Sequence, residues 1–221
     1  MIEILNIFYL LLISGIIFSF PLNNVYLKKK LSLTKLNLFE IYSFNILIIL
    51  TFFLIFSFFG ISLDLIFFSI LFLSLINFFY IDWKVFFDNF YLLIFFSLFY
   101  LVFSVEISTY PYLEWDAAVN WIFKTLNFKN NYSFQNLENV PGVLGYPHLG
   151  TYLWAFFWEV SFIDYEYTGR LSFIFIYLLI FFSIIERLKI NHLLKIIILI
   201  FLIIISFDRI LINGYQEPLM F

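Results

Sequence analysis

Cysteine is absent from this chain of 221 residues, and charged residues are scarce. Without cysteine there is no disulfide framework, no thiolate metal site and no cysteine nucleophile. Charged residues make up 12% of the chain and hydrophobic residues 64%, whereas a soluble domain has roughly 25% and 45–50%. The sequence also has no Gly-rich phosphate loop, no zinc-protease motif and no basic stripe for nucleic acid. This composition predicts an integral membrane protein that does not bind nucleic acid.

Six apolar segments are close to the length of about 20 residues that a helix needs to cross the hydrocarbon layer. We interpret all six as helices, because backbone groups that face lipid must form their hydrogen bonds within the segment. A seventh segment, Thr151–Phe162, is shorter and contains Glu159, so we expect an interfacial helix there. The predicted fold is therefore all-α, a polytopic transmembrane helical bundle. The six predicted spans are Ile4–Phe20, Ile41–Phe59, Leu65–Ile81, Phe90–Val105, Leu171–Ile185 and Leu194–Phe207.

The distribution of lysine and arginine predicts the orientation, since basic loops stay in the cytoplasm. If Thr151–Phe162 does not cross, eight basic residues lie inside and four outside, and the excess inside is smaller if it crosses. We therefore expect an outer N-terminus. The inner set comprises Lys28, Lys29, Lys30, Lys35, Lys84, Arg187, Lys189 and Lys195, and the outer set comprises Lys124, Lys129, Arg170 and Arg209.

This topology predicts three regions: residues 1–105 with four spans, residues 106–170 as a long outer loop, and residues 171–221 with two further spans and the start of another. The loop is rich in aromatic residues, which argues against disorder. From Trp115 onward, the polar residues Asp116, Asn120 and Lys124 recur every four positions, and apolar residues fill most of the positions between them. We expect an amphipathic juxtamembrane helix here, with Trp115 and Trp121 at the level of the lipid headgroups.

Two carboxylates at the start of this helix are the main candidates for chemistry. Glu114 or Asp116 can cap the helix N-terminus, which the helix dipole favours. The same pair also suits a general base or an oxygen ligand of a divalent cation. Capping and catalysis are compatible, so both interpretations stay open.

Other polar residues share the predicted outer side. His148 suits a metal ligand, a phosphate partner or a proton carrier, but also an ordinary interfacial histidine. Arg170, beside acidic residues, either extends to the interface or holds a lipid phosphate with its guanidinium fork. Glu217 follows Asn213-Gly214 in a polar turn beyond the sixth span.

Taken in order, these elements resemble bacterial GT-C type glycosyltransferases that use polyprenyl-phosphate sugars and have a Trp-Asp-Ala motif. That motif is read at Glu114–Lys124, and a Tyr-Pro block before a juxtamembrane helix is read at Tyr146-Pro147-His148-Leu149. Arg170 matches the arginine that opens the next span. Gly214–Leu219 resembles a later Gly-Tyr-Ala-Asp-Leu-Pro-Leu element, with glutamate replacing aspartate and one residue fewer before the proline.

The resemblance implies transfer of a sugar from a polyprenyl-phosphate donor to a glycan, lipid or protein acceptor, in the bacterial inner membrane with the long loop facing the periplasm. Asp116 and Glu114 would be catalytic, or would bind a divalent cation such as Mg²⁺ or Mn²⁺. The substrate-binding residues would be Lys124, Tyr146, His148, Arg170 and Glu217.

The sequence ends at Phe221 as a further span begins, so the resemblance also predicts a fragment of a longer family member. The alternative is a non-enzymatic multi-pass component, such as a scaffold, export or transport subunit. Transporters place ionisable residues within their spans, and these spans contain almost none, which argues against ion-coupled transport.

Overall fold

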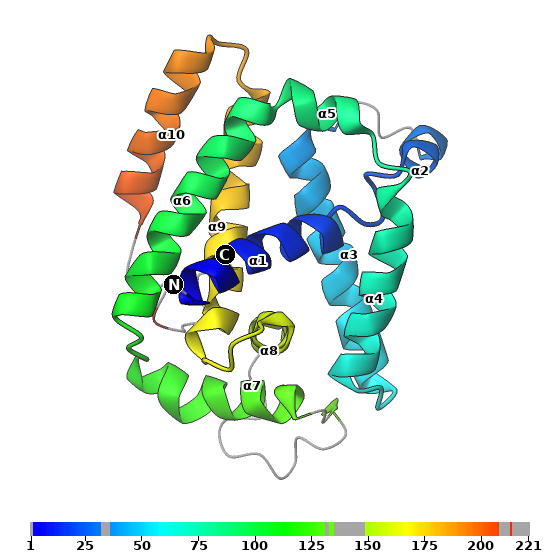
Figure 1. Ribbon diagram of the computed structural model, residues 1–221, viewed down its shortest axis with the longest axis vertical. Coiled ribbons are helices and arrows are strands. Elements are labelled where there is room, and N and C mark those ends of the chain that lie inside the picture. The colour runs from blue at the N-terminus through cyan, green and yellow to red at the C-terminus, as the bar shows by residue number, and fades with distance from the viewer. Residues whose placement is uncertain (1, 32–35, 131–132, 135–148, 208–212, 214–221) are drawn as a thin grey trace.

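The computed structural model describes residues 2–31, 36–130, 133–134, 149–207 and 213. This part of the chain forms ten α-helices and one π-helical turn, and it contains no β-strand (Figure 1). In chain order the elements are α1 (Ile2–Ile17), α2 (Val25–Lys30), α3 (Leu38–Phe58), α4 (Leu63–Phe78), α5 (Trp83–Asp88), α6 (Phe90–Thr109), η1 (Ala117–Trp121), α7 (Ile122–Lys129), α8 (Leu149–Val160), α9 (Tyr167–Arg187) and α10 (His192–Ser206).

Each of the six predicted spans is helical, with ends that differ from the prediction by a few residues. Three helices, α3, α6 and α9, are long and apolar enough to cross a membrane. The other three, α1, α4 and α10, are apolar but have only 15 or 16 residues. Helix starts follow local signals: at α10, the Asn191 side chain accepts a hydrogen bond from Leu194 N at 2.8 Å.

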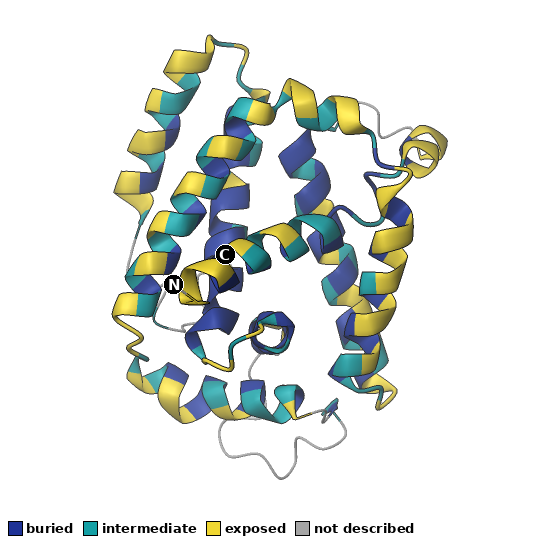
Figure 2. Ribbon diagram, in the orientation of Figure 1, coloured by how far each residue is buried: buried dark blue, intermediate teal, exposed yellow. Residues whose placement is uncertain are grey.

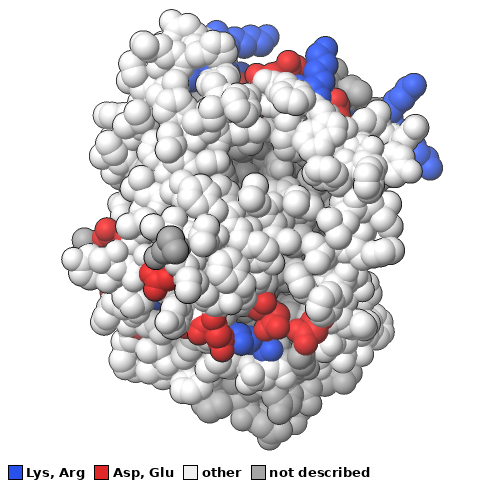
Figure 3. Space-filling model, viewed as in Figure 1, with Lys and Arg blue, Asp and Glu red and all other residues white. Residues whose placement is uncertain are grey.

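Charged side chains gather at one end of the molecule and over its opposite half, and a belt of uncharged atoms separates the two groups (Figure 3). One end carries α2, α5 and the connection from α9 to α10, which contain most of the lysines. We call it the basic end. The opposite end carries α7 and the start of α9, and we call it the acidic end. Helices of this length around an uncharged belt are the features of a membrane protein.

Helices α7 and α8 lie across the long helices rather than along them: α7 runs crosswise at the acidic end, and α8 is seen end-on in Figure 1. Helix α8 was expected at the membrane interface, but nine of its twelve residues are buried (Figure 2). It packs between α7, α3 and α9. Packing against other helices holds α8 in place, and its interfacial position stays a prediction.

Several polar residues on the apolar helices face inward. Asn6, Asn45, Ser57, Ser74 and Ser104 are all buried, while large apolar side chains cover the outer surfaces of the same helices. Lipid offers no hydrogen-bond partners, so polar groups in such helices are best placed against other helices. Asn45, for example, donates from Nδ2 to Phe18 O at 2.8 Å and accepts from Leu22 N at 2.9 Å.

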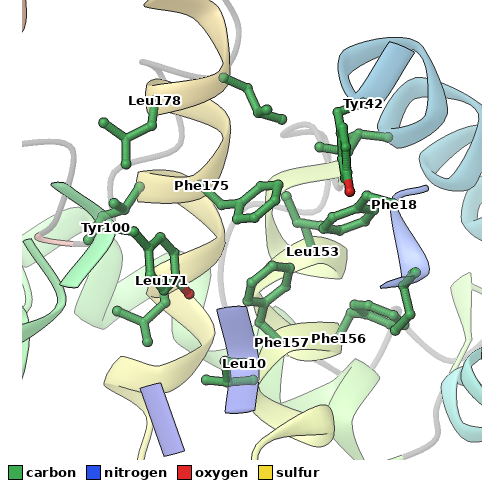
Figure 4. Packing of buried hydrophobic residues seen from close by; sticks show 14 of the residues in the cluster. Leu10, Phe18, Tyr42, Tyr100, Leu153, Phe156, Phe157, Leu171, Phe175 and Leu178 are labelled. Carbon is green, nitrogen blue, oxygen red and sulfur yellow. The ribbon is translucent and has the colours of Figure 1, made fainter. Parts of the chain in front are cut away.

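One apolar core joins the crosswise helices to the long ones. Phe157 of α8, Phe175 of α9, Tyr100 of α6 and Phe18, just after α1, meet in it (Figure 4). Helices α8 and α9 approach most closely at Gly169, where an added Cβ would lie 2.2 Å from Trp154 Cδ1 and 2.4 Å from Trp154 O. Only glycine permits this contact. The crosswise helices are thus fixed to the start of α9.

Candidate functional site

The segment that contains Asp116 forms a helix with one π-helical turn. The helix begins at Trp115, and Ile122 N donates to Ala117 O, five residues earlier. The same spacing of five residues places Trp121 beside Asp116, and Trp121 Nε1 donates to Asp116 Oδ2 at 2.9 Å. Asn120 Nδ2 donates to Asp116 Oδ1. Single π-helical turns occur frequently at functional sites.

These contacts show whether Asp116 caps the helix. Asp116 has helical backbone angles and makes no capping hydrogen bond, so the prediction that it caps the helix was wrong. The side chain bonds to residues four and five positions further on instead. Asp116 is half-buried, and two of the roughly four lone-pair positions of its carboxylate are used, so it retains acceptor capacity.

The polar face of this helix points into the protein, opposite to the prediction. Asn120 and Lys124 are buried, whereas Trp115 is 71% exposed and Val119 and Phe123 are 40% exposed. The rule that the apolar face is buried assumes water outside. Next to lipid the apolar face turns outward.

Trp121 also departs from its expected place at the headgroup level. It is buried with Ala117 of the same turn, Trp154 of α8 and Phe173 of α9. Trp115 is exposed, and its place at the headgroup level stays a prediction. The motif is therefore anchored by one tryptophan inside the protein and presents the other at the surface.

Lys124 lies one turn beyond Asn120 on the inward face. Its Nζ is 5.4 Å from the centroid of the Trp121 ring, which is a cation–π distance. Burial lowers the pKa of the Lys124 ammonium. The lysine thus adds a positive charge to the side of the helix that holds Asp116 and Asn120.

Glu114 connects this segment to the chain beyond α10. Glu114 N donates to Asn213 O at 3.1 Å, and Asn213 Nδ2 donates to Glu114 Oε1 at 3.2 Å. These contacts join residues that are 99 positions apart. Asn213 directly precedes Gly214, where the last element of the resemblance begins.

Arg170 connects the same segment to α9. Its side chain is fully buried, with Nη1 donating to Tyr112 O at 2.8 Å and Nη2 donating to Glu166 Oε2 at 2.9 Å. Its Nε lies 2.8 Å from Glu166 Oε1. We predicted that Arg170 either extends to the interface or holds a lipid phosphate. The geometry favours neither, because much of the guanidinium group already contacts Tyr112 O and Glu166.

Glu166, the partner of Arg170, was not among the predicted site residues. Burial raises the pKa of its carboxyl, and the positive charge of Arg170 opposes this rise. Trp154 Nε1 lies 3.4 Å from Glu166 O, so the residue also contacts α8. The spacing of four residues between Glu166 and Arg170 is the sequence signal that indicates this pair.

A second charged group lies nearby at the acidic end. Lys129 Nζ is 3.1 Å from Asp164 Oδ1 and 3.9 Å from Glu159 Oε2, and 5.1 Å from the centroid of the Trp158 ring. Trp158 Nε1 donates to Asp164 Oδ1 at 2.7 Å. The group ties the end of α7 to α8 and to the connection that leads into α9.

Three predicted site residues, Tyr146, His148 and Glu217, lie outside the described residues. Among the residues that the structure does describe, no three His, Cys, Asp or Glu side chains gather as ligands for a metal ion. Glu114 and Asp116 make separate sets of contacts, to Asn213 and to Asn120 with Trp121. Of the predicted residues, Glu114, Asp116, Lys124 and Arg170 belong to one connected group.

Comparison of the chain with protein-family models, with curated proteins and with solved structures finds no match. The candidate site therefore rests on its own geometry and chemistry.

Proposed function

We propose that the protein is a membrane glycosyltransferase that moves a sugar from a polyprenyl-phosphate donor to an acceptor on the periplasmic side of the bacterial inner membrane. The observation that carries this proposal is the connection of three separate segments at the acidic end. The segment of Asp116 is joined to Arg170 through Tyr112 O and to Asn213 through Glu114. These segments are the ones in which the resemblance was read.

In the proposed reaction, Asp116 is the general base. It accepts the proton of the acceptor hydroxyl or amine, and the acceptor atom forms a bond to the anomeric carbon of the donor sugar. The bond between that carbon and the phosphate oxygen breaks, and polyprenyl phosphate leaves with the electron pair. Asn120 and Trp121 act as positioning residues because their hydrogen bonds fix the carboxylate.

The leaving phosphate carries negative charge, which a nearby positive group stabilises. In the described part of the chain, Lys124 presents a buried ammonium on the same helix face as Asp116. A divalent cation would fit Asp116 as one ligand, with donor phosphate and water completing its shell, since Mg²⁺ is often bound by one or two carboxylates and substrate phosphate. Activity that is lost in EDTA and restored by Mg²⁺ or Mn²⁺ would support this second role.

The test is sugar transfer by the full chain in lipid nanodiscs, with a panel of radiolabelled polyprenyl-phosphate sugars. Asp116→Asn should lower the rate by about 10²–10⁴-fold, the typical contribution of a general base. Asp164→Asn is the matched control, because Asp164 lies at the same end but pairs with Lys129, and its rate should stay unchanged. Full activity of Asp116→Asn would remove the assignment, and no transfer by the unaltered chain would favour the non-enzymatic alternative.

A further inference from the structure

An apolar cleft opens at the end of the molecule opposite Asp116. It has a volume of about 290 Å³ and lies between α1, α3, α5, α6 and α9. In Figure 3 it is the hollow between α6 and α5, above α1. Gly15, Phe86, Leu93 and Ser97 are among the residues that line it, and most of the lining is aliphatic or aromatic.

The inclination of α1 explains why the cleft is open. Helix α1 crosses in front of the long helices at a steep angle, and it starts against the connection after α8, where Asn6 Nδ2 donates to Ser161 Oγ at 3.0 Å (Figure 1). Gly15, near the end of α1, adds space: a Cβ there would have Tyr42 Oη, at 4.0 Å, as its nearest neighbour. A larger side chain at position 15 would therefore enter the cleft without a clash at its Cβ.

The rim of the cleft carries the features of the headgroup level of a membrane. Trp83 lines the cleft and is 41% exposed, and its ring packs against Phe78 with centroids 5.0 Å apart. Tryptophan is enriched at the boundary between headgroups and hydrocarbon. The next residue, Lys84, is exposed on α5.

The charge around this rim has a positive excess. Lys28 pairs with Asp82 at 3.5 Å, and Arg187 pairs with Glu40. Four further lysines at this end are exposed and have no ion pair within the described residues: Lys29, Lys30, Lys84 and Lys189. Asp88, at the other end of α5, is an exposed opposing charge. Clustered lysines beside a membrane attract anionic lipids.

We propose that this cleft binds one acyl chain of an anionic glycerophospholipid, whose phosphate lies beside Lys84. The charge beside the cleft selects this occupant, because exposed lysines next to an apolar cleft match an anionic headgroup above an acyl chain. The aliphatic and aromatic walls match the hydrocarbon chain itself. The site is separate from the proposed transfer of sugar.

The experiment uses the full chain in nanodiscs of equimolar phosphatidylglycerol and phosphatidylcholine, with bound lipid identified by native mass spectrometry. The unaltered protein should retain one phosphatidylglycerol. Gly15→Phe and Ser97→Phe, which fill the cleft, should lose it. Leu98→Phe is the matched control, because Leu98 follows Ser97 on α6 but is 51% exposed on the outer surface, and this variant should retain the lipid.

Lys84→Glu tests the headgroup in a variant that leaves the packing intact. It should abolish the preference for phosphatidylglycerol over phosphatidylcholine. The proposal is overturned if both filling variants retain as much lipid as the unaltered protein, if the unaltered protein shows no preference between the two lipids, or if Lys84→Glu keeps that preference. Retention of an isoprenoid lipid or of a second protein copy in place of the phospholipid would also overturn it.

Discussion

The two ends of α9 each carry an arginine–glutamate pair, and the pairs differ in nearly every other respect. At the start of the helix, Arg170 is fully buried and contacts Glu166 and Tyr112 O. At the end of the helix, the Arg187 side chain is 57% exposed, and its Nη2 donates to Glu40 Oε2 at 2.9 Å. One helix thus holds one ion pair inside the protein and one at its surface.

The carboxylates at the basic end mainly satisfy the start of α3. Glu186 accepts from Leu38 N and Phe39 N, each at 2.9 Å, and Glu40 accepts from Asn37 N at 3.0 Å. These are free N–H groups of a helix N-terminus, which acidic side chains commonly satisfy. The pair at the acidic end serves no helix terminus of this kind, and it binds the segment of Asp116 to α9. We infer that the basic end maintains the fold and that the acidic end positions a site.

Removal of the buried carboxylate of Glu166 should lower the free energy of unfolding more than any other change proposed here. Glu166→Gln leaves the charge of Arg170 buried without its carboxylate, and breaking a buried ion pair on one side costs about 3–5 kcal/mol. Replacing both partners by apolar residues, as in Glu166→Leu with Arg170→Met, should recover much of this loss. Unfolding in mixed micelles with increasing SDS measures both. A stability of Glu166→Gln equal to that of the unaltered protein would contradict the comparison.

The stability of the protein should also depend on pH through Glu159 at the same end, and this effect should be smaller. Burial, together with Asp64 and Asp164, raises the pKa of Glu159 above its ordinary value of 4.5, and Lys129 opposes the rise. Between these two pKa values the folded state binds more protons than the unfolded state, so stability falls as pH rises through that window.

Thermal unfolding from about pH 4 to pH 8 measures this slope. Glu159→Gln should remove the share of Glu159 from the slope above pH 4.5, since glutamine does not titrate, while Glu166, whose pKa is also raised, should keep its share. An identical pH profile for the variant and the unaltered protein would show that Glu159 is not the group responsible.

Removal of the exposed ion pair between Arg187 and Glu40 should change the stability least. Arg187→Met removes the ion pair with Glu40 but leaves the hydrogen bond from Asn37 N to Glu40 in place. Water and salt screen such surface pairs, so the SDS unfolding midpoint should stay within experimental error at low and high salt. A loss as large as that of Glu166→Gln would mean that the two ends of α9 are equivalent in energy.

Helix positions could be predicted from the sequence because the length of an apolar run is a direct physical requirement of the hydrocarbon layer. The predicted span Phe90–Val105 lies within α6, and the predicted helix Thr151–Phe162 is shifted by two residues from α8. Side-chain directions could not be predicted in the same way. The expected juxtamembrane helix turns the face of Asn120 and Lys124 into the protein, and the spacing of four residues does not specify which side a face contacts.

The long-range contacts of the site also could not be predicted from the sequence. Nothing in the pattern indicates that Glu114 pairs with Asn213, because contacts between segments this far apart depend on how the helices are packed. The order of the motifs placed Glu114, Asp116 and Arg170 on one side, and that grouping agrees with the structure. The enzymatic role of these residues stays a prediction.

The contact of Gly169 with Trp154 has a mechanical consequence. At this point the indole and the backbone carbonyl of Trp154 pack directly on the backbone of Gly169, so the two helices cannot come closer together here. We expect this junction of α8 and α9 to be rigid, and Arg170 lies one residue beyond it. Through the hydrogen bond from Arg170 to Tyr112 O, the segment of Asp116 is attached to the part of the molecule with the least space to adjust.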